Sequence, residues 1–380
     1  MPLRIAILGT RGIPNNYGGF EQFAEHLSAG LVDRGHSVTV YNSHLHPYKK
    51  DQWNAVKIIH CFDPEKLIGA AGQFIYDLNC ILDTRKRKFD VILQLGYTSS
   101  SVWGDLLPKK SVSITNMDGI EWKRSKYSKP VKRFLKYAES LAVRKSDFLV
   151  ADSLEIMKYL KTKYDLNINY IPYGAAEYCN EDEKILSEYC VTKRDFSLLM
   201  ARMEPENNIE TVLDGVHSGN SKNKFVVIGD ITNRFGKYIF HKYKNDDRIQ
   251  FTGSIFHPQK VHTLRTFSHL YFHGHSVGGT NPSLLEAMSS KALIAAHDNP
   301  FNKSVLQNDA LYFSDASDVK RIIETDQGCD REQMVSNNFC KIKDQFNWQT
   351  IISQYEDLML KCCYDVPTIN NVPNETIAFN

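Results

Sequence analysis

Residues 273–288 read His-Gly-His-Ser-Val-Gly-Gly-Thr-Asn-Pro-Ser-Leu-Leu-Glu-Ala-Met, a glycine-rich turn between a short apolar run and a predicted helix. Asn281 is a good N-cap, and Pro282 suits the first helical position. Such a turn directs backbone N–H groups toward an anion, and the helix dipole favours negative charge at the same place. We therefore expect a phosphate-binding site here, although an ordinary strand-to-helix turn in an α/β domain has the same pattern.

Two further features lie within this stretch. Glu286 is about one turn inside the predicted helix, so its carboxylate can accept hydrogen bonds from hydroxyls on the molecule that carries the phosphate. His273 and His275 stand at alternate positions before the turn, which is a metal-ligand pattern. Because the sequence offers no third ligand at suitable spacing, we favour a packing or pocket-wall role for both histidines.

The start of the chain predicts a βαβ unit. Residues 4–8 form an apolar run that ends at Gly9, and an amphipathic helical pattern then extends to Gly35. Gly9 and Gly12 are three positions apart, whereas the dinucleotide fingerprint needs two, which argues against a nicotinamide or flavin site. Gly18 and Gly19 lie at the helix start, where a side chain would block close approach of a ligand.

The same alternation continues along the chain and predicts an α/β protein with two doubly wound domains. Strand-like runs occur at 37–41, 56–62, 90–95, 111–115, 147–151, 169–172, 196–201, 224–229, 248–253, 269–272, 292–296 and 311–313. A polar, mostly helical connector is expected at 177–193. We predict an N-terminal domain at 1–175, a C-terminal domain at 176–345, a helix at 346–363 that packs back on the first domain, and a disordered tail at 364–380.

Ligands of doubly wound sheets bind at the carboxyl ends of the strands. Asp118 and Glu121 follow the strand at 111–115, so both could face such a crevice. An alternative is a plain turn at Asp118-Gly119 with Glu121 in solvent.

Composition limits the classes of function. The 380 residues have a net charge of +2, which argues against a dedicated nucleic-acid binder. The eight cysteines include no Cys-x-x-Cys pair, and the first residues form neither a signal region nor a membrane span. We therefore expect a reduced, cytoplasmic protein.

Four motifs in order resemble the retaining GT-B glycosyltransferases of family 4, and more narrowly its bacterial rhamnosyltransferase branch, which builds capsules and cell-wall polysaccharides. The resemblance covers nearly the whole chain. Its motifs are residues 9–21, residues 118–124, residues 201–209 and residues 278–288. It implies two Rossmann-like domains facing a central cleft, an acceptor on the N-terminal domain with Tyr17, Glu121 and Trp122 on that side, and a nucleotide-sugar on the C-terminal domain.

The resemblance also implies roles for single residues. Gly18 and Gly19 approach the donor diphosphate, and Arg202 neutralises it. Glu286 matches the second glutamate of the paired-glutamate motif, which holds the sugar ring of the nucleotide. The remaining donor contacts fall on Asn207, Gly278, Gly279, Thr280 and Asn281. No metal and no cofactor is required.

Three positions depart from the family pattern. Asn207 stands in place of the usual lysine, Gly278 in place of the first glutamate, and Asp118 in place of the usual N-terminal histidine. Asp118 could supply the carboxylate that stabilises an oxocarbenium-like transition state. Arg202 and the N–H groups of 278–281 could together replace the lysine.

The function implied is transfer of L-rhamnose from dTDP-L-rhamnose to a lipid-linked saccharide. A transferase using a UDP- or GDP-sugar, a noncatalytic nucleotide-sugar-binding subunit and an epimerase remain alternatives. Residues Lys109–Lys145 hold eleven basic and three acidic residues interleaved with aromatic ones. This is either a solvated face or a surface that docks on the inner, anionic face of the plasma membrane.

Overall fold

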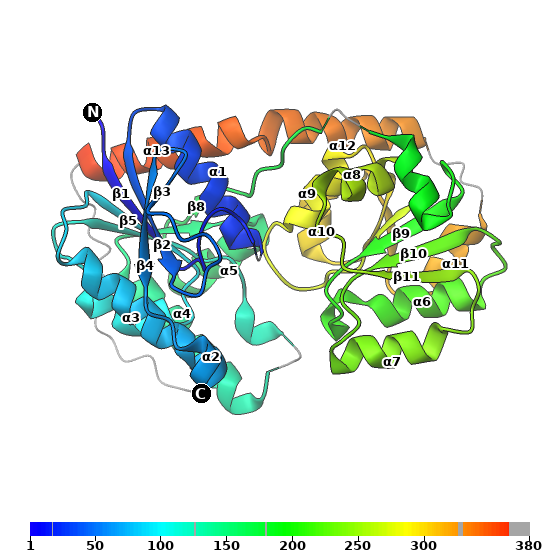
Figure 1. The fold of residues 1–380 in the computed structure, drawn as a ribbon, viewed down its shortest axis with the longest axis horizontal. Coiled ribbons are helices and arrows are strands. Elements are labelled where there is room, and N and C mark those ends of the chain that lie inside the picture. Colours follow the sequence, from blue (N-terminus) through cyan, green and yellow to red (C-terminus); the bar gives the residue numbers. More distant parts are fainter. Residues whose placement is uncertain (17, 125–126, 179–180, 326–329, 365–380) are drawn as a thin grey trace. The chain divides into compact units, whose positions relative to one another are not determined.

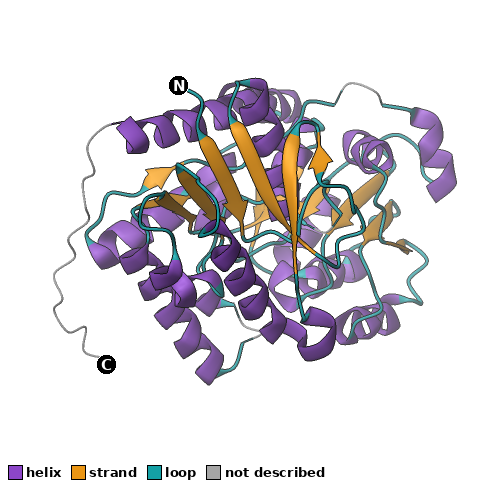
Figure 2. Cartoon of the chain, turned by 60° about the vertical axis from the view of Figure 1, so that its left-hand side comes forward, coloured by secondary structure: helices purple, strands orange, loops and turns teal. Residues whose placement is uncertain are grey.

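The computed structural model describes residues 1–16, 18–124, 127–178, 181–325 and 330–364. The chain divides into two compact units. Unit 1 consists of Met1–Trp122, Tyr127–Pro172 and Ile351–Asn380, and unit 2 consists of Lys123–Lys126 and Tyr173–Thr350. Each unit is built on its own β-sheet with helices on both faces (Figures 1 and 2). The predicted α/β class with two Rossmann-like domains is confirmed.

Unit 1 contains an eight-stranded sheet in the order β3-β4-β2-β1-β5-β6-β7-β8. Its strands are β1 (Arg4–Leu8), β2 (Ser37–Ser43), β3 (Gln52–Trp53), β4 (Val56–Cys61), β5 (Val91–Leu95), β6 (Val112–Asn116), β7 (Phe148–Ala151) and β8 (Asn169–Tyr170). The predicted strands are all present. The two-residue strand β3 was not predicted, and it pairs antiparallel with β4 across Asn54 and Ala55, both of which have positive φ.

The helices of unit 1 cover both faces of this sheet. They are α1 (Gly19–Asp33), α2 (Glu65–Ile68), η1 (Gly69–Ala71), α3 (Gly72–Thr84), η2 (Ser100–Leu106), η3 (Glu121–Lys123), α4 (Lys129–Lys145), α5 (Leu154–Tyr164) and α13 (Trp348–Tyr364). Lys123 of η3 and the first three residues of α13 are assigned to unit 2. Helix α3 buries Tyr76, Cys80 and Ile81 against Ala6 of β1 and Ile92 of β5. Burial of this apolar face fixes α3 on the sheet.

Unit 2 contains a six-stranded parallel sheet in the order β11-β10-β9-β12-β13-β14. Its strands are β9 (Phe196–Met200), β10 (Lys224–Ile228), β11 (Ile249–Gly253), β12 (Tyr271–His273), β13 (Ile294–His297) and β14 (Leu311–Phe313). Its helices are η4 (Glu183–Tyr189), η5 (Pro205–Asn207), α6 (Ile209–Ser218), α7 (Arg234–Tyr243), α8 (Pro258–Phe267), α9 (Pro282–Ser289), α10 (Pro300–Leu306), α11 (Ala316–Glu324) and α12 (Arg331–Gln345).

The connector at 177–193 is less helical than predicted. The described part of it holds the short 3-10 helix η4, which ends where Cys190 takes a left-handed conformation with φ +52°. A left-handed residue cannot continue a helix, so the chain turns toward β9 instead.

The strand order reverses at one point in each sheet: between β1 and β5 in unit 1, and between β9 and β12 in unit 2. A glycine stands at each of these switch points, because a Cβ at Gly9 would collide with the Leu95 carbonyl and a Cβ at Gly274 with the Asn207 carbonyl. Ligands of such sheets bind in the crevice at the switch point. The topology therefore directs attention to the loops after β1, β5, β9 and β12.

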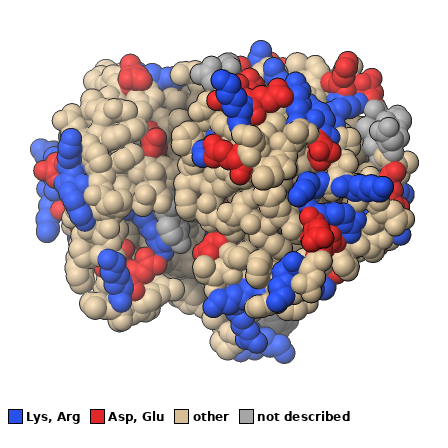
Figure 3. Space-filling model, turned by 45° about the vertical axis from the view of Figure 1, so that its right-hand side comes forward, with Lys and Arg blue, Asp and Glu red and all other residues tan. Residues whose placement is uncertain are grey.

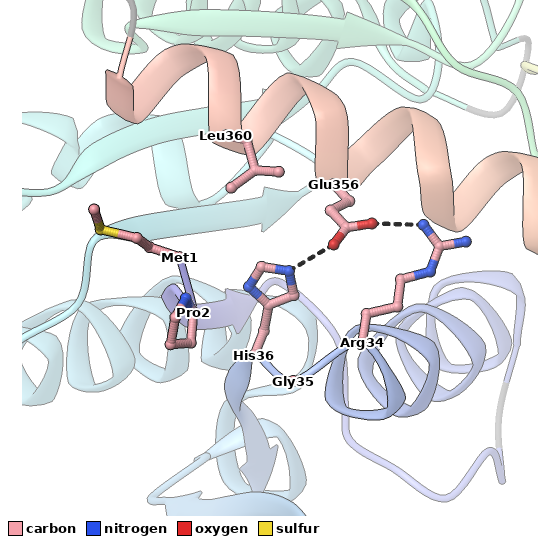
Figure 4. A pocket seen from close by; sticks show the side chains of 7 residues that line it. All are labelled: Met1, Pro2, Arg34, Gly35, His36, Glu356 and Leu360. Atoms are coloured by element: carbon pink, nitrogen blue, oxygen red, sulfur yellow. Dashed lines mark hydrogen bonds and ion pairs between the residues drawn. The ribbon is translucent and has the colours of Figure 1, made fainter.

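Helix α13 is anchored within unit 1 at the amino ends of β1 and β2. Glu356 of α13 accepts hydrogen bonds from Arg34 Nη1 at 2.6 Å and from His36 Nε2 at 2.9 Å (Figure 4). His36 Nδ1 accepts from the Leu3 amide at 3.0 Å, so the neutral Nε2–H form of the ring satisfies both contacts. These side chains line a shallow pocket of about 320 Å³. The predicted tail at 364–380 starts with Tyr364, the last residue of α13, and 365–380 lie outside the described residues.

None of the helices described is both long and apolar enough to span a bilayer. Figure 3 shows one face of the surface, on which basic and acidic side chains are interspersed. This pattern agrees with the net charge of +2.

Candidate functional site

The glycine-rich loop after β12 leads into α9 as the sequence predicts. Asn281 is the N-cap, and its Oδ1 accepts a hydrogen bond from the Ser283 amide at 2.9 Å, with Pro282 in the first helical position. Gly278 has φ +142°, and a Cβ placed there would meet no described atom within 4 Å. Gly279 and the buried Thr280 complete the loop. The loop and the start of α9 lie at the switch point of unit 2, which is where anions commonly bind in folds of this kind.

The loop after β9 packs directly against this glycine-rich loop. The Ser276 amide and hydroxyl donate to the Glu206 carbonyl at 3.1 and 2.8 Å. The side chain of Asn207 is buried, and its Nδ2 donates to the Arg202 carbonyl at 2.7 Å. The side-chain amide of Asn207, at the position where the resembled family has a lysine, therefore holds the turn that carries Arg202.

His273 and His275 lie beneath the loop as a stacked pair, with ring centroids 4.4 Å apart. Burial lowers the pKa of His275 to about 3, and the positive charges of Arg202 and Arg124 contribute to this shift. Burial likewise lowers the pKa of His273 far below its ordinary value. Both rings are neutral at physiological pH, so the positive charge of the site comes from arginine and from backbone N–H groups.

Glu286 is held by a buried arginine that the sequence analysis missed. Arg265 of α8 is 2% exposed, and its Nη1 donates to Glu286 Oε2 at 2.7 Å. The Nη2 atom of the same guanidinium donates to Ser283 Oγ at 3.1 Å. The signal in the sequence was weak: Arg265 follows Leu264 and stands four residues after Val261 on the buried face of α8.

In unit 1, the loop after β1 is fastened by Glu21, a second residue that the sequence analysis did not select. Its buried carboxylate accepts from Thr10 Oγ1 at 3.1 Å and from the Arg11 amide at 2.8 Å. Gly18 is the extended N-cap residue of α1, and Gly19 is the first residue of that helix. Tyr17, predicted on the acceptor side, lies outside the described residues.

Asp118 follows β6 and lies beside the switch point of unit 1. A Cβ added at Gly96, just after β5, would be 3.9 Å from Asp118 Oδ1. Tyr97 donates to the Gly119 carbonyl at 2.9 Å, which holds the loop on its inner side. Burial raises the pKa of the Tyr97 phenol, and the charges of Glu139 and Asp118 raise it further.

A buried carboxylate holds the other end of this loop. Glu139 of α4 is 1% exposed, and its Oε2 accepts from Trp122 Nε1 at 3.1 Å. Its Oε1 accepts from the side chains of Tyr159, Lys163 and Tyr164, all on α5. Four donors on one carboxylate join α4, α5 and the loop after β6. A charged residue on the buried face of α4 was the available signal.

The structure thus assembles the predicted residues in two sets. Unit 2 brings together the loops of Arg202 and Asn207, the loop 278–281 and Glu286. Unit 1 brings Asp118, Glu121 and Trp122 onto one loop beside the switch point, with Gly18 and Gly19 at the start of α1. In the residues that the structure describes, no group of three or more His, Cys, Asp or Glu side chains could hold a metal ion.

Two family models match the sequence. Residues 3–176 match the model described as "Domain of unknown function (DUF1972)", and residues 181–325 match the model described as "Glycosyl transferases group 1". Among curated proteins, none matches this sequence.

Several solved structures are similar to the chain over nearly its whole length. Sucrose-phosphate synthase from Thermosynechococcus elongatus has a TM-score of 0.75 at 15% identity, covering 94% of this chain and 98% of that one. HepE from Anabaena, in complex with UDP and glucose, has a TM-score of 0.75 at 15% identity, covering 94% of this chain and 100% of that one. Trehalose 6-phosphate synthase from Burkholderia multivorans has a TM-score of 0.68 at 10% identity, covering 95% and 97%.

At such identities these similarities establish the fold, which is GT-B. The match over residues 181–325 adds the type of domain that this fold carries. The chain is a GT-B glycosyltransferase with a group 1 domain.

Proposed function

We propose that the protein is a retaining, metal-independent rhamnosyltransferase that moves L-rhamnose from dTDP-L-rhamnose to a lipid-linked saccharide in bacterial surface polysaccharide synthesis. The observation that supports the donor part of this proposal is the arrangement of residues in unit 2. There a glycine-rich loop and the start of α9 meet the loop of Arg202, and the partly exposed Glu286 is paired with the buried Arg265.

This arrangement suits a nucleoside diphosphate leaving group. The loop N–H groups and Arg202 supply preorganised positive charge where the diphosphate becomes more negative as the glycosidic bond breaks. Glu286 accepts a nucleoside hydroxyl. HepE was solved with UDP-glucose, a donor of the same chemical class.

Two features favour dTDP-L-rhamnose. Its deoxyribose offers Glu286 a 3′-hydroxyl, and its sugar lacks the 6-hydroxyl that the first glutamate of the family pattern would face. Gly278 has no carboxylate at that position. With retention, a β-linked donor gives a β-L-rhamnoside.

The test is a thermal-shift screen of the purified protein against dTDP-, UDP- and GDP-sugars, followed by turnover with lipid-linked glucose or N-acetylglucosamine. A ligand at about 100 times its Kd stabilises the folded state by about 2.7 kcal/mol, which such a screen detects. We expect nucleoside diphosphate release from dTDP-L-rhamnose when acceptor is present, and a β anomer by NMR.

Other results would select the alternatives. A shift in melting temperature without release of nucleoside diphosphate indicates a noncatalytic binding subunit. Conversion of donor without acceptor indicates an epimerase. Transfer from a UDP- or GDP-sugar alone, or an α-linked rhamnoside, contradicts the proposed donor or the proposed stereochemistry.

We propose that the acceptor binds to unit 1, and that a surface of this unit docks on the membrane. The start of α4 carries Lys129, Lys132 and Arg133, with Val131 39% exposed among them. Helix α3 touches α4 where the rings of Phe74 and Phe134 lie 5.6 Å apart. Exposed apolar side chains occur nearby, on α2 and α3: Leu67, Ile68 and Ile75. Cationic and apolar groups together favour binding to anionic lipids.

Reversal of Lys129, Lys132 and Arg133 to Glu tests this surface by sedimentation with vesicles of phosphatidylglycerol and phosphatidylcholine at low salt. Each cation near such a surface contributes about 1 kcal/mol, so the triple variant should lose binding. Lys136 is left unchanged because its Nζ lies 4.5 Å above the Trp122 ring. The matched control reverses Arg234, Lys237 and Lys244 at α7 and should sediment like the wild type. Wild-type protein that stays in the supernatant refutes the membrane surface.

A further inference from the structure

The donor site proposed above does not explain what the buried Arg265 contributes to ligand binding. A buried guanidinium is costly unless it is paired, and in a binding site it could have been replaced by an apolar side chain. Here it reaches two turns of α9 at once, because Nη1 donates to Glu286 Oε2 at 2.7 Å and Nη2 to Ser283 Oγ at 3.1 Å. Ser283 is the residue whose amide is capped by Asn281.

The guanidinium is itself held in place from other sides. Its central carbon lies 5.7 Å from the ring centroid of Tyr271, and its Nη2 is 3.5 Å from Met200 Sδ. The hydroxyl of Tyr271 is 2.9 Å from Ser283 Oγ. Tyr271 lies on β12 and Met200 on β9, the two strands of the switch point. One planar cation therefore ties both of these strands to the start of α9 and to Glu286.

The charge of the pair also fits the proposed ligand. An unpaired carboxylate on α9 would repel a diphosphate bound at the start of the same helix. Paired with Arg265, the Glu286 carboxylate is neutralised but remains an acceptor for a hydroxyl. The planar guanidinium donates to Glu286 and to Ser283 Oγ in fixed directions, whereas a lysine ammonium lacks such a fixed pair of donors.

We propose that Arg265 is a positioning residue of the donor site, which holds Glu286 in the orientation that recognises the 3′-hydroxyl of the nucleoside diphosphate. This role rests on the proposed function. Arg265 acts through Glu286 and Ser283 and does not touch the ligand.

The test measures preference for a hydroxyl by titration calorimetry. Of dTDP, UDP and GDP, the tightest binder is compared with its 3′-deoxy analogue in the wild type and in Arg265→Met, Arg265→Lys and Glu286→Gln. A hydrogen bond to a charged group predicts that the wild type prefers the 3′-hydroxyl about tenfold to a hundredfold. Arg265→Met should reduce this preference to below about threefold, and the double variant Arg265→Met/Glu286→Gln should lose no more, because both residues act on one contact.

Arg248 supplies the matched control. It is also paired with a carboxylate in unit 2, Asp246 at 2.8 Å, and it donates to the carbonyls of Gly219 and Ser221, away from the glycine-rich loop. Arg248→Met should lower the melting temperature and keep the 3′-hydroxyl preference. A general loss of stability therefore cannot imitate the expected result.

The outcomes separate the two proposals. Wild-type protein that binds none of the three nucleoside diphosphates overturns the proposed function and this role with it. Binding with the wild-type preference in folded Arg265→Met overturns the role of Arg265 alone. If Arg265→Met does not fold, Arg265→Lys decides: a reduced preference supports the role, and an unchanged one overturns it.

Discussion

The two switch points of this protein have the same topology but are stabilised in different ways. In unit 2, Arg265, Ser283 and Glu286 lie within 22 residues of one another, and the loops of β9 and β12 are joined by backbone contacts such as Ser276 to Glu206. In unit 1, the loop of Asp118 is held by residues that do not belong to it: Tyr97, which precedes it in the sequence, and Glu139 on the following helix.

This difference separates two kinds of site. The unit 2 loops are short and internally bonded, which suits the recognition of one invariant group, a diphosphate. The unit 1 loop is hydrogen-bonded to the phenol of Tyr97 and to the buried carboxylate of Glu139, so its shape depends on α4 and α5. We infer that the proposed donor site depends on contacts within unit 2 and that the position of Asp118, the proposed reacting carboxylate, is set by the packing of unit 1.

The largest effect is expected at Asp118, where the proposed chemistry takes place. Asp118→Asn should lower kcat about 10²- to 10⁴-fold, the range for a charged group acting in the transition state, and change the donor KM much less. Steady-state kinetics with varied donor gives both numbers. Asp33→Asn, which changes an exposed carboxylate at the end of α1, is the control. A variant with wild-type kcat would mean that Asp118 belongs to a turn and not to the reaction.

The second prediction removes the buried carboxylate that holds the unit 1 loop. Glu139→Leu leaves Lys163 and two tyrosine hydroxyls without their acceptor, so the free energy of unfolding should fall by about 3–5 kcal/mol. Urea unfolding measures this loss. Glu155→Leu removes the more exposed ion pair with Lys158 and should cost less than about 1 kcal/mol. Equal losses in the two variants would contradict the role given to Glu139.

The third prediction concerns the charge that unit 2 offers to a diphosphate. Arg202→Ala should weaken binding of nucleoside diphosphate by about 1.5–3 kcal/mol, or roughly tenfold to a hundredfold. Arg234→Ala, an exposed arginine on α7, is the control for loss of net charge. Calorimetric titration of both variants decides. Unchanged affinity in Arg202→Ala would remove this arginine from the donor site.

The structure also changes how Glu286 must be tested. Glu286→Ala would leave Arg265 buried without its carboxylate, so a loss of donor binding could reflect a damaged fold. Glu286→Gln keeps an oxygen acceptor for the guanidinium and is the informative substitution. The sequence alone gives no reason to prefer one of these substitutions, because it does not show the contact with Arg265.

Features carried by contiguous residues were predictable from the sequence. The strands follow from apolar runs, and the start of α9 follows from Asn281 and Pro282, because these signals depend on local backbone chemistry. The short strand β3 was not predicted, because two residues are too few to show a periodic pattern. Its presence depends on the turn at Asn54 and Ala55.

Features that depend on tertiary contacts could not be predicted in the same way. Arg265 and Glu139 look like ordinary helix charges until the fold shows that each is buried against a distant partner. Asn207 was expected to face the donor, and its amide bonds to the Arg202 carbonyl. A local pattern shows which residue type is present, but not whether its partner is a ligand or the chain itself.

The last prediction uses pH to distinguish the two units. Burial raises the pKa of Asp77 in unit 1 to about 7, whereas burial lowers that of His275 in unit 2 to about 3. For Asp77 the folded state binds the extra proton, so stability falls as pH rises from about 4 to 7, by at most about 1.4 kcal/mol per pH unit. For His275 the unfolded state binds it, so stability falls as pH drops from about 6.5 to 3.

Asp77→Asn and His275→Gln should therefore change the pH profile in opposite directions. Relative to wild type, Asp77→Asn should become more stable as pH rises from 5 to 7, and His275→Gln should become more stable as pH drops below 6.5. Urea unfolding at half-unit steps between pH 4.5 and 8 measures both differences. Profiles that run parallel to the wild type in both variants would mean that neither group titrates with folding. Because the pKa of His275 is lowered to about 3, we expect protonation of this ring to contribute nothing to the proposed diphosphate binding between pH 5.5 and 8.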